Sequence, residues 1–497
     1  MKNIKKIVAL VIAVAMVLAM GVSVFAAEHT VSAPTDRANH TYEIYQVFTG
    51  TVDGDQLTNL KYGVNAVGTT NSAVSQADMA ALDALGDMAG KTDQEKITAL
   101  SPYVNFDSTP IATVGKGANA SASLPEGYYV IKDTDDSLED PDTYTLYIFK
   151  VLNADVTIDP KDSTTESHKN IGETVDANNK ITDTDIGKSV PYVLTVKLPS
   201  NYADYKDFYL NFVDDMSKGL TLDTDSVKIH YGASDTTGTA ISFSAVAGTS
   251  YEGGQKYEYK IADLKTVEAA RGLGADDIVW VTYTATVNSD AVIGEAGNPN
   301  KFHVDYSNNP NKTGDGNTNS TPDETNIVLT FKTVFNKVDP EGNALTGADF
   351  TLEKKVGDNW VDVTTLSDGN INPTKTGSTS GSEFSFTGLG QGDYRLTETA
   401  IPEGYNEMSP NPVEFTVSAT YSIQGDTATI SALTGGTALE FTSDTSAGSL
   451  TADIENQSGA ELPTTGGMGT TIFYIVGAIL VIGGGILLIS KRRMHAE

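Results

Sequence analysis

Alternation of apolar and polar residues runs along most of this chain and predicts strands rather than helices. The stretches TYEIYQVF (41–48), DIVWVTYTATV (277–287) and VEFTVS (413–418) alternate or are rich in β-branched and aromatic residues. Turns rich in Gly, Asn and Asp separate such segments, as they do in sheet proteins. The pattern therefore predicts an all-β protein.

One segment near the N-terminal end breaks the alternation. In SQADMAALDALGDMAG (75–90), Met79, Leu82 and Leu85 lie at helical spacing. Ser75 and the acidic residue three positions later form a capping-box pattern, which marks the start of a helix. We expect a short helical insertion in the N-terminal domain.

Two polar stretches interrupt the strand pattern, DPKDSTTESHK (159–169) and NNPNKTGDGNTNSTPDETN (308–326). The second also fits a long surface loop inside a domain. A length of 497 residues favours about three domains. We expect three β-sandwich domains of immunoglobulin-like type, and their bounds are an N-terminal domain at 27–160, a middle domain at 161–330 and a C-terminal domain at 331–461.

Both ends of the chain have the pattern of targeting segments. The basic start MKNIKK, an apolar run and a small-residue site ending at Ala26 predict a secretory signal peptide over 1–26. Near the other end, the apolar segment 472–489 is just long enough to span a bilayer. The tail 490–497 contains KRR and is expected to stay cytoplasmic.

Composition excludes several classes of protein. The net charge of −32 argues against nucleic acid and anionic lipid as partners. The absence of cysteine removes disulfides and thiolate chemistry. The six histidines show no metal-ligand spacing, and acidic turns such as DTD (183–185) lack a full calcium-loop pattern. We expect no metal and no cofactor.

The segment LPTTGG lies directly ahead of the apolar span. Pro463 fixes an extended backbone, and Gly466 leaves the carbonyl of Thr465 open to a nucleophile. In this position the segment resembles the LPxTG sorting signal of Gram-positive surface proteins, with the motif at Leu462, Pro463, Thr464, Thr465 and Gly466 (462–466). The resemblance implies that a sortase cleaves after Thr465 and passes its acyl group to an amine.

Polar residues end the inward-facing rows of several expected strands. In FKTVFNKVD, YRLTET and LTADIEN the rows of apolar side chains end at Lys337, Glu398 and Asn456. The middle domain repeats this set with Lys169, Asp214 and Asn308, where Asn308 is chosen over the next asparagine by parity alone. The alternative is that these residues face solvent at strand ends and the alternation is coincidental.

A lysine, a carboxylic acid and an amide in a dry site can react together. Burial lowers the pKa of an amine and raises the pKa of a carboxylic acid, so a proton can move from the amine to the acid. The neutral amine then attacks the carboxamide while the protonated acid polarises the carbonyl, and ammonia leaves. The product is an amide bond between lysine and asparagine.

Longer segments carry a more specific resemblance. YRLTETAIPEGY (394–405) resembles the E-box of Cna B-type domains, and NKVDPEGNALTGADFTL (336–352) resembles their first strand. HKNIGE, FVDDMSKGL and HVDYSNNP resemble the middle domain of Gram-positive backbone pilins, and YEIYQVF and LPEGYYVIKDT extend the likeness to the first domain. The resemblance implies isopeptide bonds Lys337–Asn456 and Lys169–Asn308, promoted by the acids Glu398 and Asp214.

Lys161 stands among acidic residues in DVTIDPKD. Its parity is opposite to that of Val156 and Ile158, so it is expected to face water. The segment resembles the pilin motif, which usually ends in YPKN and whose lysine attacks the sortase acyl-enzyme, although Asp159 and Asp162 replace the tyrosine and the asparagine. The alternative is an ordinary linker lysine.

These resemblances together imply a structural backbone subunit of a covalent cell-surface pilus that supports adhesion. Sortase would join subunits head to tail through Thr465 and Lys161. The implied partners are pilus-type and housekeeping sortases, identical subunits, peptidoglycan, minor pilins and host ligands. Isopeptide formation happens once per site, so we expect a sortase substrate and not an enzyme. The alternative is a wall-anchored LPxTG adhesin that binds its ligand without polymerising.

Overall fold

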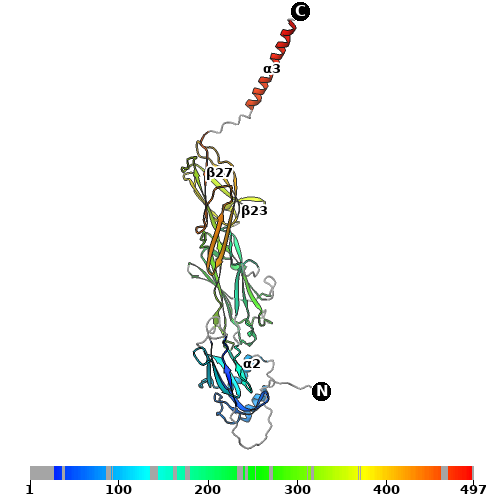
Figure 1. Ribbon diagram of the computed structural model, residues 1–497, viewed down its shortest axis with the longest axis vertical. Coiled ribbons are helices and arrows are strands. Elements are labelled where there is room, and N and C mark those ends of the chain that lie inside the picture. The colour runs from blue at the N-terminus through cyan, green and yellow to red at the C-terminus, as the bar shows by residue number, and fades with distance from the viewer. Residues whose placement is uncertain are drawn as a thin grey trace.

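Three β-rich domains follow one another in line along the molecule (Figure 1). The structure is a computed structural model and describes residues 27–35, 40–85, 91, 93–134, 144–160, 165–173, 179–231, 239–240, 244–251, 253–267, 272–310, 312–314, 318–367, 369, 371–459 and 468–494. The all-β prediction with a short helical insertion is confirmed.

The N-terminal domain contains two sheets and two helices. The larger sheet has the order β3-β2-β6-β7 with β4 on β2, and the smaller one has the order β5-β1-β8. The bounds of its elements are β1 (Glu28–Ser32), β2 (Thr41–Asp53), β3 (Gln56–Tyr62), α1 (Gln76–Ala84), α2 (Asp93–Leu100), the 3-10 turn η1 (Ser101–Tyr103), β4 (Ala112–Gly115), β5 (Ser121–Pro125), β6 (Gly127–Asp133), β7 (Leu146–Val151) and β8 (Val156–Thr157).

The predicted helix is α1, and its start is the predicted one. Ser75 caps the helix, because its side chain accepts a hydrogen bond of 3.0 Å from the backbone N–H of Asp78. Helix α2 was not predicted, because DQEKITAL has only two aliphatic positions, Ile97 and Leu100, that become buried.

The middle domain is a sandwich of two sheets. One sheet has the order β10-β21-β19-β12-β17-β16 with β20 on β19, and the other has the order β15-β14-β18-β11-β9 with β13 on β18. The bounds are β9 (Glu166–Ile171), β10 (Ile181–Asp183), β11 (Ser189–Lys197), η2 (Tyr202–Asp204), β12 (Leu210–Met216), β13 (Leu220–Leu222), η3 (Thr224–Ser226), β14 (Lys228–Tyr231), β15 (Thr239–Ala240), β16 (Ser244–Tyr251), β17 (Gly254–Ile261), β18 (Ile278–Val287), β19 (Asn298–Ser307), β20 (Thr318–Ser320) and β21 (Glu324–Leu329).

The C-terminal domain is a second sandwich, and its sheets have the orders β25-β26-β22-β31-β30 and β24-β23-β27-β28-β29. Its first and last long strands, β22 and β31, lie side by side and parallel. The bounds are β22 (Phe331–Val338), β23 (Asp349–Val356), β24 (Asn359–Asp362), η5 (Val363–Thr365), β25 (Thr374–Thr376), β26 (Glu383–Leu389), β27 (Gly392–Ala400), β28 (Val413–Gln424), β29 (Thr427–Thr434), β30 (Thr442–Asp444) and β31 (Ser449–Glu455).

The last element is the helix α3 (Met468–Met494). Its segment Tyr474–Lys491 is long and apolar enough to cross a membrane, as the sequence predicted. The signal peptide 1–26 and the sorting motif 462–466 lie outside the described residues.

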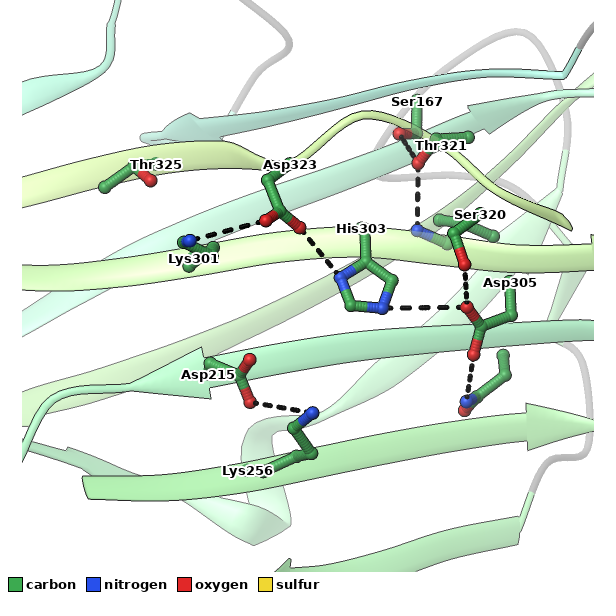
Figure 2. A network of polar contacts seen from close by, with 12 residues as sticks. Ser167, Asp215, Lys256, Lys301, His303, Asp305, Ser320, Thr321, Asp323 and Thr325 are labelled. Carbon is green, nitrogen blue, oxygen red and sulfur yellow. Dashed lines mark hydrogen bonds and ion pairs between the residues drawn. The ribbon is translucent and has the colours of Figure 1, made fainter. Parts of the chain in front are cut away.

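Alternation along each strand determines which side chains form the cores. On β19, Phe302, Val304 and Tyr306 point into the middle domain and are fully buried. The residues between them point outward and make polar contacts: Lys301 and His303 pair with Asp323, and His303 also pairs with Asp305 (Figure 2). Nearby on the same face, Lys256 pairs with Asp215. A charged residue on the inner face is therefore an exception in this domain.

The middle and C-terminal domains share a strand rather than a flexible linker. On β21, Val328 packs in the middle core, while Ile327 and Leu329 pack in the C-terminal core. The polar stretch 308–326 therefore includes part of a strand of the middle sandwich, in line with the alternative of a loop inside a domain. The predicted division near 330 stays a prediction, because the two cores meet within one strand.

Candidate functional site

The lysine predicted to react in the C-terminal domain lies in its interior. Lys337 is fully buried near the end of β22, level with Ile454 on the parallel strand β31. Its Nζ donates a 2.7 Å hydrogen bond to the carbonyl oxygen of Ile454. Burial lowers the pKa of Lys337 to about 8, against the opposing effect of Glu398 and Glu455. The neutral form of the Lys337 amine is therefore populated near neutral pH.

Glu398 and Asn456 meet in the same interior. Glu398 reaches in from β27 on the facing sheet, and Asn456 follows the end of β31; their exposed fractions are 4% and 1%. The Asn456 Nδ2 donates a 2.8 Å hydrogen bond to the Glu398 Oε1. The other carboxylate oxygen accepts from the backbone N–H of Met408 at 2.8 Å. The Asn456 Oδ1 is buried and has no hydrogen-bond partner among the described residues.

The middle domain holds a second buried lysine against an acid. Lys169 on β9 and Asp214 on β12 are both fully buried, and the Lys169 Nζ lies 2.5 Å from the Asp214 Oδ1. Burial lowers the pKa of Lys169 to about 8, although the negative charge of Asp214 opposes this shift. The rings of Tyr192, Tyr283 and Phe302 surround the Nζ at 5.3, 6.0 and 5.9 Å. The amine therefore lies in a dry, aromatic site.

The structure places Asn308 away from this pair. Asn308 comes after the end of β19, and its Nδ2 donates to the Asn319 Oδ1 at 2.7 Å. Asp214 is level with Phe302 on β19. At about 3.4 Å per residue, Asn308 lies about 20 Å further along the chain direction.

A different asparagine is close to the Lys169–Asp214 pair. Asn300 is two residues before Phe302, faces the same core and is fully buried. Its Nδ2 donates to the hydroxyl of Tyr283 at 2.9 Å, and its Oδ1 is buried without a hydrogen-bond partner among the described residues. Asn300 and Lys169 thus contact the same tyrosine.

Charged side chains also hold the backbone of Lys169. Glu324 accepts from the Lys169 N–H at 2.7 Å, and the Nζ of Lys180 donates to the Lys169 carbonyl oxygen at 2.6 Å. Lys180 and Glu324 are themselves paired at 2.5 Å, and His168 lies 2.9 Å from the same carboxylate. Burial raises the pKa of Glu324, but the hydrogen bonds from Lys180, the Lys169 N–H and His168 outweigh it and lower the pKa overall.

Lys161 and the sorting motif lie outside the described residues. The residues before Lys161 are anchored in the N-terminal domain. Ile158 is buried there, and the Asp159 N–H donates to the hydroxyl of Tyr147 at 3.0 Å. Thr165 is buried again just ahead of β9. Lys161 therefore follows the last anchored residues of the first domain and precedes the second.

The sequence pattern predicted both lysines and both acids to be interior residues, but it did not predict the positions of Asn300, Tyr283 and Glu324 next to them. Asn300 had a signal, since it shares the parity of Phe302, Val304 and Tyr306. Asn300 lies at the N-terminal end of that row, whereas the predicted partner of Lys169, Asn308, lies at its C-terminal end. The roles of Tyr283 and Glu324 depend on contacts between sheets, which a single strand's pattern does not contain.

Three family models match separate parts of the chain. Residues 186–310 match "Gram-positive pilin backbone subunit 2, Cna-B-like domain", residues 331–429 match the SpaA "Prealbumin-like fold domain", and residues 454–495 match the "LPXTG cell wall anchor motif". The matches cover most of the middle sandwich, without the strand of Lys169, then much of the C-terminal sandwich with Lys337, and finally the predicted sorting segment.

Relatives agree with these matches. The chain is 28% identical over 395 residues to the trypsin-resistant surface T6 protein of Streptococcus pyogenes serotype M6, and this alignment covers 65% of the chain and 68% of that protein. The solved structure of the T6 backbone pilin of serotype M6 S. pyogenes has a TM-score of 0.51 at 21% identity. It covers 87% of this chain and 98% of the solved chain. This structural likeness bears on the fold.

Proposed function

We propose, from the premise that the chain belongs to the Gram-positive backbone pilins, that sortase joins its copies head to tail through Thr465 and Lys161. The chain is a structural pilus backbone subunit anchored in the cell wall. Helix α3 fits the segment that holds the precursor in the membrane behind the sorting motif.

The place of Lys161 supports the head-to-tail joint. The lysine directly follows Pro160, and the chain just before it is fixed to the first domain through Asp159 and Ile158. A short segment held at both ends presents a side chain at low entropic cost. The second end of the joint, Thr465, lies six residues beyond Gly459, the last described residue of the C-terminal domain, so it can extend at most about 20 Å from that domain.

We further propose that each sandwich contains one lysine–asparagine isopeptide bond. The observation that carries this proposal is the burial of Lys337, Glu398 and Asn456 in one contact network, with the Asn456 amide on the Glu398 carboxylate at 2.8 Å. Two buried charges and an amide whose carbonyl lacks a partner are costly as a final state. Conversion into a neutral amide removes that cost, with Glu398 as the acid that transfers the proton.

In the middle domain we propose the bond Lys169–Asn300, promoted by Asp214. The contacts of Asn300 with Tyr283, and of Lys169 with Asp214, favour this pairing over the predicted Lys169–Asn308 bond, because the side chain of Asn308 is bonded to Asn319. Peptide mapping separates the two pairings directly. A Lys169 peptide crosslinked to the peptide that contains Asn308 would restore the prediction.

The polymer is tested by a boiled denaturing gel of wall extract, immunoblotted for this protein, in wild type and Lys161→Ala. We expect a high-mass ladder in wild type that collapses to monomer in the variant. Lys116→Ala, which changes an exposed lysine of the first domain, should leave the ladder intact. A ladder that survives Lys161→Ala moves the acceptor to another lysine. A wild type without a ladder, under conditions of expression, favours the monomeric wall-anchored adhesin.

A further inference from the structure

The two sandwiches present their asparagine amides to different groups. In the C-terminal domain the Asn456 Nδ2 donates directly to the catalytic carboxylate of Glu398, at 2.8 Å. In the middle domain the acid Asp214 is bonded to the lysine, and the Asn300 Nδ2 donates to the hydroxyl of Tyr283 instead, at 2.9 Å. A tyrosine therefore takes the place, next to the leaving nitrogen, that a carboxylate takes in the other domain.

Tyr283 is held rigidly between the acid and the amide. It lies on β18, opposite Tyr192 on β11, and the two rings stack with centroids 5.2 Å apart. Its side chain is 2% exposed. Burial, followed by the charge of Asp214 and a hydrogen bond to that carboxylate, raises the pKa of Tyr283 well above its ordinary value. The hydroxyl thus stays protonated next to Asp214, and it accepts the hydrogen bond from the Asn300 Nδ2.

We propose that Tyr283 is a catalytic residue of the middle-domain bond and passes a proton from Asp214 to the nitrogen that leaves Asn300. This inference rests on the proposed Lys169–Asn300 bond and adds a residue to it. The tyrosine touches a reacting atom, the Asn300 Nδ2, which distinguishes it from residues that only shape the site.

The proton transfers balance. The ammonium of Lys169 first gives a proton to Asp214 across their 2.5 Å contact, and the neutral amine attacks the Cγ of Asn300. Tyr283 then gives its phenolic proton to Nδ2 and receives the proton of Asp214. The C–Nδ2 bond breaks and ammonia leaves, while the proton lost by the new amide nitrogen returns to Asp214. Tyr283 ends as it began. Asp214 ends with the proton that the Lys169 ammonium held at the start, and it returns to the carboxylate when it gives this proton to the departing ammonia, which leaves as ammonium.

The test follows bond formation in newly made full-length chain. The chain is synthesised in a short cell-free pulse, quenched at intervals in denaturant and digested, and the crosslinked peptides of each domain are quantified by mass spectrometry. Tyr283→Phe should slow the Lys169–Asn300 bond by roughly tenfold or more, since one proton-transfer group is typically worth at least that much. The Lys337–Asn456 bond in the same molecules is the internal control and should form at the wild-type rate.

A matched variant and a substituted tyrosine separate catalysis from structure. Tyr202→Phe removes another buried hydroxyl from the same core, whose charged neighbours are Asp263 and Asp277 rather than Asp214, and it should leave the rate unchanged. Replacement of Tyr283 by a ring-fluorinated tyrosine keeps the ring and the fold but makes the phenol more acidic. We expect this substitution to speed bond formation if the phenolic proton is transferred, whereas a hydroxyl that only orients Asn300 would leave the rate as it was.

The outcomes are distinct. A wild-type rate in both Tyr283→Phe and the fluorinated protein overturns the role of Tyr283 while the Lys169–Asn300 bond stands. If Tyr283→Phe fails to fold, the fluorinated protein alone decides, by a changed or an unchanged rate. A wild-type chain with no Lys169–Asn300 peptide overturns the proposed bond itself, and the tyrosine's role with it.

Discussion

At the scale of single residues, the two buried lysines differ from every ordinary lysine in their protonation. Burial lowers the pKa of Lys337 to about 8 from its usual 10.5. Without the crosslink, the folded chain therefore binds fewer protons than the unfolded chain between about pH 8 and about pH 10.5. The free energy of unfolding should rise with pH across that window, because a depressed lysine pKa penalises folding most where the unfolded amine is charged.

This pH dependence is measurable in Asn456→Ala, which cannot form the bond. We expect its free energy of unfolding to increase by on the order of 1–3 kcal/mol between about pH 8 and pH 10, relative to Lys337→Met/Asn456→Ala. The second variant removes the titrating amine and keeps a side chain of similar length, so it corrects for all other titrations. Parallel pH profiles for the two variants would contradict a lowered pKa at Lys337.

Glu398 is expected to be required for the C-terminal bond. Glu398→Gln keeps the shape of the side chain but cannot take up and return a proton. After correction for the mass change of the substitution itself, the mature chain should then be heavier than wild type by one ammonia. Loss of a crosslink that closes a loop of on the order of a hundred residues should cost about 4–5 kcal/mol in the chain-entropy model.

The measurement is intact mass together with urea unfolding of the full chain. Glu403→Gln changes an exposed carboxylate of the same domain end. It should lose ammonia as wild type does, and its free energy of unfolding should equal that of wild type. A Glu398→Gln chain that still loses ammonia at the C-terminal site would assign the proton transfer to another group.

Single residues also explain why the sequence predicted only part of the site. A lysine or an acid that has the parity of a row of apolar residues is predicted to be buried with them. The residues predicted in this way are Lys337, Glu398, Lys169 and Asp214, and the structure buries all four. The partner of Lys169 could not be fixed, because Asn300 and Asn308 have the same parity and β19 carries asparagines at both ends. The level of Asp214 against Phe302 and the side-chain contacts of the two asparagines distinguish them.

At the scale of elements, β9 is an edge strand whose outer side is held by side chains. Among the strands that the structure describes, it pairs in its sheet with β11 alone. The hydrogen bonds of Glu324 and Lys180 to the Lys169 backbone take the place of a neighbouring strand, at 2.7 and 2.6 Å. This clamp fixes the strand before a covalent bond exists, since an edge strand otherwise frays and moves its side chains.

Glu324→Gln should therefore slow formation of the middle-domain bond severalfold without changing the chemistry of the site. A neutral side chain weakens the contacts to Lys180 and to the Lys169 N–H. The slowing should disappear once the bond has formed, so mature Glu324→Gln should melt close to wild type. Time-resolved peptide mapping gives the rate.

Glu258→Gln, on β17 of the same sheet as Glu324, is the matched control, because Glu258 accepts from Asn211 and β17 pairs with β12 and β16. If Glu324→Gln forms the bond at the wild-type rate, the clamp is unnecessary for the reaction. The clamp could not be predicted from the sequence, because Glu324 lies in a polar stretch whose pattern fits a domain boundary and a surface loop equally well.

At the scale of the molecule, the proposed bonds connect the sandwiches in different ways. Lys337 and Asn456 would tie the parallel first and last strands of one sheet. Lys169 and Asn300 would tie two facing sheets. Tension entering at Lys161 and leaving at Thr465 would cross both sandwiches and bypass the N-terminal domain. The junction between the sandwiches is then the part of the load path for which no covalent crosslink is proposed.

That junction is built around Asp185. Its carboxylate is bonded to the Nζ of Lys354 at 2.8 and 2.6 Å, to the N–H of Gly390 at 2.7 Å and to the hydroxyl of Tyr394. Asp185 belongs to the middle domain and is 5% exposed, whereas its three partners belong to the C-terminal domain. Removal of one member of a buried ion pair leaves the other charge without compensation, at a typical cost of about 3–5 kcal/mol.

We expect Asp185→Ala to uncouple the two sandwiches. Calorimetry of wild type should show them melting together, because β21 contributes to both cores and the ion pair links them. In Asp185→Ala the C-terminal domain should melt separately and earlier, since the partly buried Lys354 loses its counter-ion. Asp185→Ala/Lys354→Met should recover part of the coupling by replacing the charge of Lys354 with an apolar chain.

The matched control is Arg395→Ala, which removes a surface ion pair with Glu353 inside the C-terminal domain and should not separate the transitions. Coincident melting in Asp185→Ala would mean that the shared strand β21 alone transmits the coupling.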